Sequence, residues 1–140
     1  MRMPGEAAVD VDERIALEAR RLAVVLEHVE AENEQDLDRA MSTFHHARYE
    51  IMPIGLVVDG DDAVRELLAA NWTAMPGLRF SATGIFHGAD GIAVETHTTG
   101  EHDGRPVDMM SVNLFLFDGD RLVCERCYFD QVTSAENLGG

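Results

Sequence analysis

The sequence predicts an α+β fold, in which three N-terminal helices pack on one face of a curved, mainly antiparallel sheet. Apolar residues repeat at helical spacing through the first half of the chain, whereas the second half consists of long β-type runs separated by short turns. The 140 residues contain no repeat and no linker. We therefore expect a loose arm over residues 1–9 and a single domain over residues 10–140.

Three helices are predicted before the long strands. The first covers residues 10–32 and opens with an acidic capping box. Asn33 is placed to cap a second helix that carries an apolar side as far as Phe44. The third helix opens at the Asp-Gly-Asp-Asp turn of residues 59–62 and stops before a Pro-Gly pair.

The strands form two groups. Two short extended runs precede the third helix, and four long runs follow it, joined by Gly- and Asp-containing turns. The predicted strands are 48–53, 56–59, 78–87, 92–102, 107–117 and 121–130.

The composition excludes several classes of partner. The formal net charge is −15, so neither nucleic acid nor an anionic membrane is an expected partner, because both bind basic surfaces. No apolar run reaches transmembrane length. The two cysteines, Cys124 and Cys127, point to opposite faces of one predicted strand, which suits reduced thiols in a cytoplasmic protein.

Several local motifs accompany this element order from about Ala19 to Gly139. With them the chain resembles the SnoaL-like group of polyketide and ester cyclases, within the nuclear-transport-factor-2-like superfamily. The motifs that carry the resemblance are Asn33-Glu-Gln-Asp-Leu-Asp38, Phe44-His-His-Ala-Arg-Tyr-Glu50, Asp59-Gly-Asp-Asp-Ala-Val-Arg65, Gly100-Glu-His-Asp-Gly104 and Tyr128-Phe-Asp130 with Asn137-Leu-Gly139.

The resemblance implies a cone-shaped α+β barrel with a deep pocket for a small apolar ligand, and homodimers formed through the outer face of the sheet. It also implies an acid/base role for an Asp near the end of the last strand, a position that Asp130 matches. In the cyclases this residue enolises a polyketide ester for ring closure by an aldol reaction, with no metal or organic cofactor.

Alternation along the last predicted strand places Tyr128 and Asp130 on one face, which we interpret as the inner one. Asp130 is then either a general acid/base with a raised pKa in a dry pocket or a capping carboxylate for the tail that begins at Gln131. Tyr128 either binds a substrate carbonyl or fills the core.

Other candidate site residues lie on neighbouring elements. Alternation places His102 on the same face of its strand as the apolar residues at the strand's start, which we expect to face the core. We interpret His102 as a catalytic partner or, alternatively, as a turn histidine. Asn113 is a buried amide that either contacts a ligand or satisfies the backbone. Candidates for the pocket wall, with plain core as the alternative, are Trp72, Tyr49 and Met52.

The leading hypothesis is a cofactor-free acid/base cyclase or isomerase that acts on an apolar, carbonyl-bearing substrate. Two alternatives stay open: a non-catalytic ligand-binding or dimerisation module, and a hydrolase or dehydratase in which Asp130 activates water. None of the six histidines has the spacing of a metal motif, so no metal site is expected.

Overall fold

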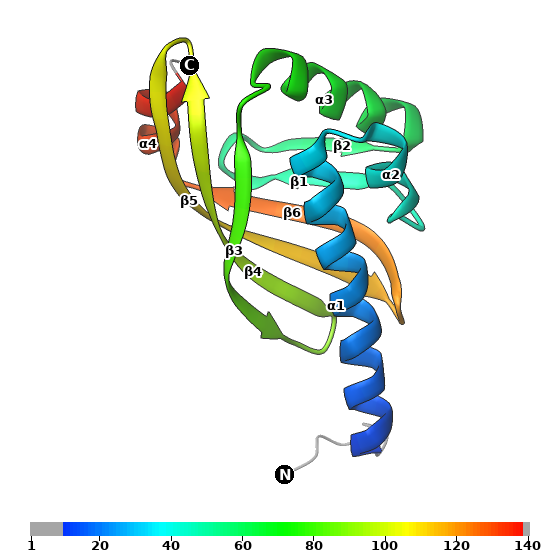
Figure 1. Ribbon diagram of the computed structural model, residues 1–140. Coiled ribbons are helices and arrows are strands. Elements are labelled where there is room, and N and C mark those ends of the chain that lie inside the picture. The colour runs from blue at the N-terminus through cyan, green and yellow to red at the C-terminus, as the bar shows by residue number, and fades with distance from the viewer. Residues whose placement is uncertain (1–9, 139–140) are drawn as a thin grey trace.

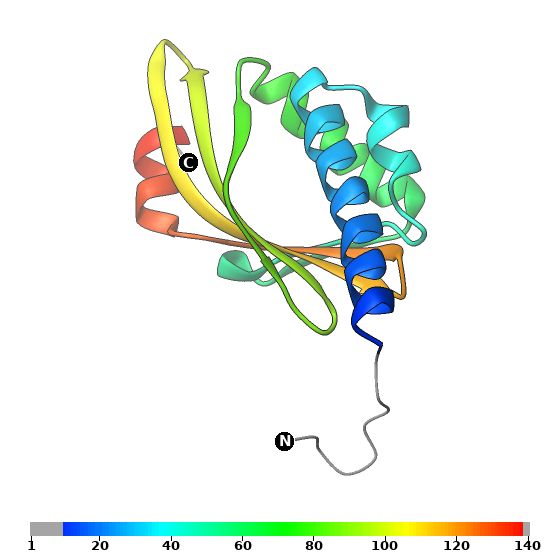
Figure 2. The same cartoon turned by 60° about the horizontal axis from the view of Figure 1, so that its bottom comes forward.

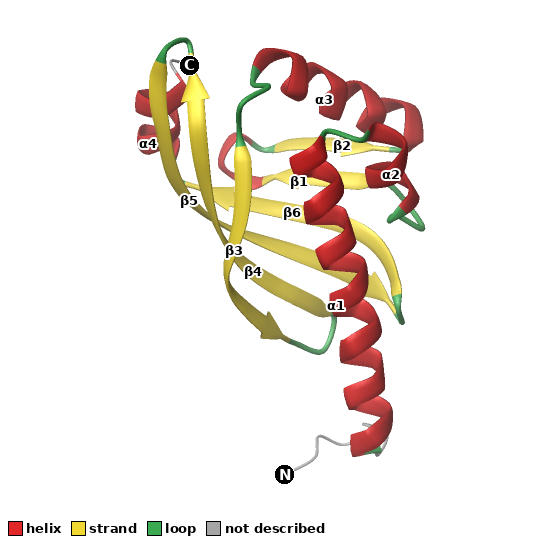
Figure 3. Cartoon of the chain, in the orientation of Figure 1, coloured by secondary structure: helices red, strands yellow, loops and turns green. Residues whose placement is uncertain are grey.

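The computed structural model describes residues 10–138 and confirms the α+β class: one six-stranded sheet with helices packed against it (Figures 1 and 3). The predicted arm of residues 1–9 and the motif residue Gly139 lie outside the described part. The elements are α1 (Val11–Glu34), α2 (Leu37–Ser42), β1 (Arg48–Ile51), the 3₁₀ turn η1 (Met52–Ile54), β2 (Leu56–Asp59), α3 (Asp61–Ala74), β3 (Arg79–His87), β4 (Gly91–His102), β5 (Arg105–Asp118), β6 (Arg121–Phe129) and α4 (Gln131–Leu138).

The strand order is β2-β1-β6-β5-β4-β3. The pair β1–β6 is parallel and all other neighbouring strands are antiparallel. The sheet bends strongly, and α1 and α3 lie on the side toward which β3, β4 and β5 rise (Figure 2). This curvature leaves space between the helices and the sheet.

The start of α1 agrees with the sequence, because Asp10 Oδ1 accepts a hydrogen bond of 2.7 Å from the backbone N–H of Asp12. Asn33, however, lies inside α1 and caps nothing. Its side-chain amide donates to the carbonyl of Phe80 (2.8 Å) and accepts from the N–H of Phe80 (2.7 Å). Asp36 caps α2 instead, and its side chain accepts a hydrogen bond of 3.2 Å from the backbone N–H of Arg39.

A β-bulge in β6 changes which side chains face the helices. Leu122 pairs with Phe117 and Cys124 pairs with Leu116, which leaves Val123 as an extra residue. One extra residue reverses the alternation of all later side chains on the strand. The residues that face the helices beyond the bulge are Glu125, Cys127 and Phe129, opposite Phe115, Asn113 and Ser111 of β5.

The second half of the chain ends in a helix that the sequence patterns did not predict. In α4, Asn137 accepts a hydrogen bond of 2.8 Å from the backbone N–H of Asp108 on β5. At the other end of the molecule the buried Arg21 of α1 donates to the carbonyl of Gly119 (2.7 Å) and to that of Ala89 (3.2 Å). Arg21 thereby holds two strand turns against α1.

Candidate functional site

A cavity of about 370 Å³ lies between α1, α3 and the inner face of the sheet. A volume of this size accommodates a small organic ligand. Its wall is mostly apolar and combines Leu67, Leu68 and Trp72 of α3 with Leu78, Phe80, Met109, Phe115, Cys127 and Phe129 of the sheet and its approach. The position and lining therefore suit an apolar ligand held inside the fold.

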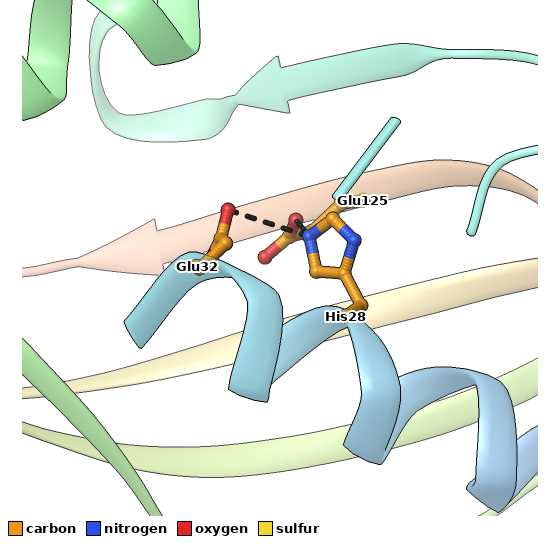
Figure 4. Close-up of side chains that lie close together, drawn as sticks. All are labelled: His28, Glu32 and Glu125. Atoms are coloured by element: carbon orange, nitrogen blue, oxygen red, sulfur yellow. Dashed lines mark hydrogen bonds and ion pairs between the residues drawn. The ribbon is translucent and has the colours of Figure 1, made fainter. Parts of the chain in front are cut away.

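Four polar side chains converge beside this cavity: Glu32, Tyr49 and Glu125 line it, and the fully buried His28 contacts all three. His28 and Glu32 lie one turn apart on α1, Tyr49 lies on β1 and Glu125 lies on β6. Figure 4 shows His28, Glu32 and Glu125. His28 Nε2 is 3.1 Å from Glu125 Oε2, 3.3 Å from Glu32 Oε1 and 3.0 Å from Tyr49 Oη. Tyr49 Oη donates to Glu32 Oε1 at 2.9 Å. We call these four residues the inner cluster.

Thr43 determines how the imidazole of His28 is oriented. The hydroxyl of Thr43 donates its single proton to the carbonyl of Ala40 (2.6 Å), so Oγ1 must accept at 2.7 Å from Nδ1–H of His28. The Nδ1 proton is therefore committed outside the inner cluster. Nε2 is left to face the two carboxylates.

Burial and charge shift the titration of the inner cluster. Burial alone would lower the pKa of His28, but the charge of Glu32 and the hydrogen bond to Glu125 outweigh it and raise that pKa to about 10. Burial raises the pKa of Glu125, and the nearby charge of Glu32 adds to the effect. Burial and the charge of Glu125 raise the pKa of Tyr49 well above its ordinary value, so Tyr49 remains a neutral donor.

The inner cluster also supplies the ligand atoms of a possible cation site. One atom each from His28, Glu32 and Glu125 lies within 4.8 Å of the others, and no other such group of three occurs among the described residues. Imidazole with two carboxylates is a donor set that suits divalent ions such as Zn²⁺. The expectation of no metal site rested on the spacing of pairs of histidines, whereas this group has one histidine, an acid one turn later on α1 and an acid from β6.

Asp130 does not lie where the sequence interpretation placed it. Its side chain is absent from the described cavity lining and caps α4, accepting from the N–H of Val132 (3.0 Å) and the hydroxyl of Thr133 (2.7 Å). These bonds hold the pKa of Asp130 below its ordinary value, opposite to the predicted rise. The interpretation of the facing was wrong because the bulge at Val123 reverses the alternation.

Three further candidates lie outside the cavity. Tyr128 lies on the outer face of the sheet, because the bulge at Val123 reverses the alternation along β6, and 41% of its surface is exposed. His102 lies at the end of β4, where Nε2 is 3.4 Å from Asp103 Oδ2, as the turn interpretation allowed. Met52 is exposed in η1. None of the three belongs to the described lining.

The remaining candidates do line the cavity. Asn113 donates from Nδ2 to Thr96 Oγ1 at 3.1 Å, and Trp72 and Tyr49 form parts of the wall. The predicted inner face of β4 is confirmed, since Ile92, Val94, Thr96 and Thr98 are all buried. Strand alternation was thus reliable where no bulge intervenes.

Sequence reasoning did not select His28, Glu32 or Glu125. A signal existed for the first two, because His28 and Glu32 stand at i and i+4 on a predicted helix and share one face of it. Glu125 is an acid within a mostly apolar strand, but its facing depended on the bulge. No local pattern connects α1 to β6.

Comparison with known families gives a direct assignment. A family model described as a SnoaL-like domain matches residues 25–125, which is most of the chain. The chain belongs to the SnoaL-like domain family. This SnoaL-like chain also has the fold of the nuclear-transport-factor-2-like superfamily, as its structural neighbours show. A comparison with curated proteins finds no match.

Solved structures share the fold of the SnoaL-like chain at low sequence identity. A phenazine biosynthesis-related protein from Pseudomonas aeruginosa has a TM-score of 0.77 and 15% identity, covering 93% of this chain and 92% of that chain. The epoxide hydrolase/cyclase-like enzyme SalBIII, named for pyran ring formation in the polyether salinomycin, has a TM-score of 0.71 and 24% identity, covering 83% and 95%.

A third neighbour is a hypothetical protein with a ketosteroid isomerase-like fold from Catenulispora acidiphila, in complex with trimethylamine. Its TM-score is 0.73 at 15% identity, with 83% of this chain and 92% of that chain covered. At these identities the likeness shows a common fold and no common reaction. Among the described helices of the SnoaL-like chain, none has the length and apolarity needed to cross a membrane.

Proposed function

We propose that this protein is a small-molecule enzyme that transfers protons to and from an apolar, carbonyl-bearing substrate held in the cavity, as a cyclase or isomerase does. The observation that carries the proposal is the inner cluster. It places a buried carboxylate with a raised pKa, Glu125, beside a neutral hydroxyl donor, Tyr49, on the wall of an otherwise apolar cavity.

The roles follow from the chemistry of each group. Glu125 is the base that takes a proton from the carbon next to the carbonyl, because a raised pKa brings a carboxylate closer to neutrality as a proton acceptor. Tyr49, whose hydroxyl donates to Glu32 in the free protein, turns this donor to the enolate oxygen that forms. The imidazolium of His28 lies 3.1 Å from Glu125 and 3.3 Å from Glu32 and offsets their negative charge.

The family assignment and the neighbours support the same class of reaction. The neighbours include a protein named as an epoxide hydrolase/cyclase-like enzyme and one named for phenazine biosynthesis. Both names refer to chemistry on small organic molecules, although at their identities they transfer no substrate to this chain.

The proposal is tested with a ketone probe, without knowledge of the natural substrate. Proton NMR in D₂O follows the exchange of the C1 protons of 2-tetralone, with protein at catalytic concentration. We expect exchange to be faster with protein than in buffer, and Glu125→Gln to remove about 100-fold or more of the acceleration, since a positioned base contributes about 10²–10⁴-fold.

The matched control is Glu101→Gln, the same chemical change at an exposed position on β4. It should leave the exchange rate unchanged. Binding of 2-tetralone in the cavity without any acceleration of exchange would refute the enzyme and favour a ligand-binding module of the same fold.

We further propose a homodimer through the outer face of the sheet. This face exposes apolar side chains from three strands: Phe86, Met110, Val112 and Tyr128. Exposed apolar side chains that gather on one face are typical of a surface that another chain covers. Analytical ultracentrifugation should give a dimer for the wild type and a monomer for Val112→Glu; a monomeric wild type would refute this interface.

A further inference from the structure

We infer that the substrate presents a hydrogen-bond donor, a hydroxyl or a protonated amine, to the two carboxylates of the inner cluster and carries no carboxylate or phosphate. The inference rests on the proposed function only in taking the cavity as the ligand site. It names the class of substrate that the chemistry of the wall selects.

The inner cluster contains more acceptors than donors. Glu32 and Glu125 provide four carboxylate oxygens. The donors that reach them are Nε2–H of His28 and the hydroxyl of Tyr49. The second imidazole proton of His28 is unavailable because Thr43 accepts it. His28 Nε2 engages Glu125 at Oε2, and the hydroxyl of Tyr49 engages Glu32 at Oε1.

Both carboxylates reach the cavity. Glu32 and Glu125 belong to its lining, and no buried side-chain oxygen of the described residues lacks a hydrogen-bond partner. Glu32 keeps 13% of its side chain exposed, and its Oε2 takes part in none of the hydrogen bonds described above. A donor on the ligand would complete the hydrogen bonding of a carboxylate that is removed from bulk water.

The charges on the wall oppose an anionic ligand. No lysine or arginine occurs among the described lining residues, which include the two carboxylates of Glu32 and Glu125. The nearest arginine on β6, Arg126, pairs with Glu50, and so does Arg48 on β1. A carboxylate in the cavity would thus be desolvated without a cation to pair with.

Two amides of the wall donate within the protein. Asn113 donates one N–H of Nδ2 to Thr96 Oγ1. Gln35 donates from Nε2 to the carbonyls of Met75 (3.4 Å) and Pro76 (3.3 Å). The charged groups of the wall are acceptors, the carboxylates of Glu32 and Glu125.

The test uses four probes with one naphthalene body: 2-naphthol, 2-naphthylmethylammonium, 2-methoxynaphthalene and 2-naphthoate. Their dissociation constants for the full chain are measured at neutral pH by ligand-observed NMR. We expect the naphthol, the ammonium or both to bind at least about tenfold more tightly than the methoxy compound, because a hydrogen bond to a charged acceptor strengthens binding by about that factor or more. The naphthoate should bind most weakly.

The comparison of the naphthol with the ammonium distinguishes the two donor classes. Glu125→Gln and Glu32→Gln, each checked for folding by circular dichroism, should reduce the preference for donors and relieve the exclusion of the naphthoate. Glu101→Gln should preserve both. If one of these two variants does not fold, the other variant and the affinities of the wild type for the four probes still test the inference.

Tightest binding by the methoxy compound or the naphthoate would overturn the donor inference and leave the cavity as a ligand site. The same holds if Glu125→Gln and Glu32→Gln fold and both keep the full wild-type preference. Binding of none of the four probes would overturn the proposed ligand site as well.

Discussion

Glu125 and Asp130 are acids at the two ends of one short segment, yet their environments are opposite. Glu125 is buried in β6 against a histidine and a tyrosine, and its pKa is raised. Asp130 follows the strand, accepts two hydrogen bonds at the start of α4, and has a lowered pKa. The difference shows that the surroundings of a carboxylate, more than its place near a strand end, determine whether it is suited to move protons.

Asp130 still contributes to the site indirectly. By capping α4 it orients the helix that brings Ser134 to the cavity lining. A direct catalytic role for Asp130 stays a prediction, and the two carboxylates can be compared in one assay.

The largest expected effect is on proton exchange in 2-tetralone. Glu125→Gln should lower the protein-dependent rate by about 100-fold or more, because Gln cannot accept the proton. Asp130→Asn should stay within about twofold of wild type, since an amide oxygen can still cap a helix. NMR rates for both variants make the comparison; equal losses would show that Asp130 takes part in the chemistry.

Tyr49→Phe is expected to have the next largest effect. Removal of one donor to a developing oxyanion lowers the rate by about 10²–10³-fold in a well-studied protease, and we expect roughly a 100-fold loss of exchange here. The other tyrosine of the chain supplies the control, because Tyr128 lies on the outer face. Tyr128→Phe should exchange 2-tetralone at the wild-type rate; a slower Tyr128→Phe would contradict the assignment of the two sheet faces.

His28→Gln should destabilise the fold and change its dependence on pH. Loss of the cation between the buried Glu125 and the partly buried Glu32 is expected to lower the free energy of unfolding by about 3–5 kcal/mol near neutral pH. His46→Gln, at an exposed His46–Asp59 pair, should change it by less than about 1 kcal/mol. Urea unfolding of the three proteins provides the measurement.

The sign of the pH effect follows from the raised pKa of His28. Protonation of His28 stabilises the folded state fully below its ordinary pKa of 6.5, and this stabilisation is lost as the pH rises toward about 10. The free energy of unfolding of the wild type should therefore fall over that interval, and His28→Gln should lack this part of the slope. A wild type of constant stability across the interval would contradict a protonated His28.

The smallest expected effect is that of Asp130→Ala. Without its cap, α4 should open more readily while the inner cluster keeps its stability. Hydrogen–deuterium exchange should quicken at the amides of α4 and stay unchanged at those of α1 near His28. Faster exchange at both places would mean that Asp130 supports the cavity as a whole.

Much of the fold was predictable from the sequence. Helical periodicity located α1 and α3, the cap at Asp10 marked the start of α1, and turn residues separated the four long strands, because these signals act between residues close in the chain. The cavity wall was predicted in part, since Trp72, Tyr49 and Asn113 do line it. The bulge at Val123 was not predictable, because it is defined by pairing with β5.

The sequence by itself determined the α+β class, the order of the elements before α4 and the acidic character of the chain. Only the tertiary structure decided which acid enters the cavity. That choice depends on one extra residue in β6 and on the packing of α1 across the sheet, which brings His28 and Glu32 to Glu125. Local propensity acts over a few residues, whereas the raised pKa of a buried carboxylate arises from groups that only folding brings together.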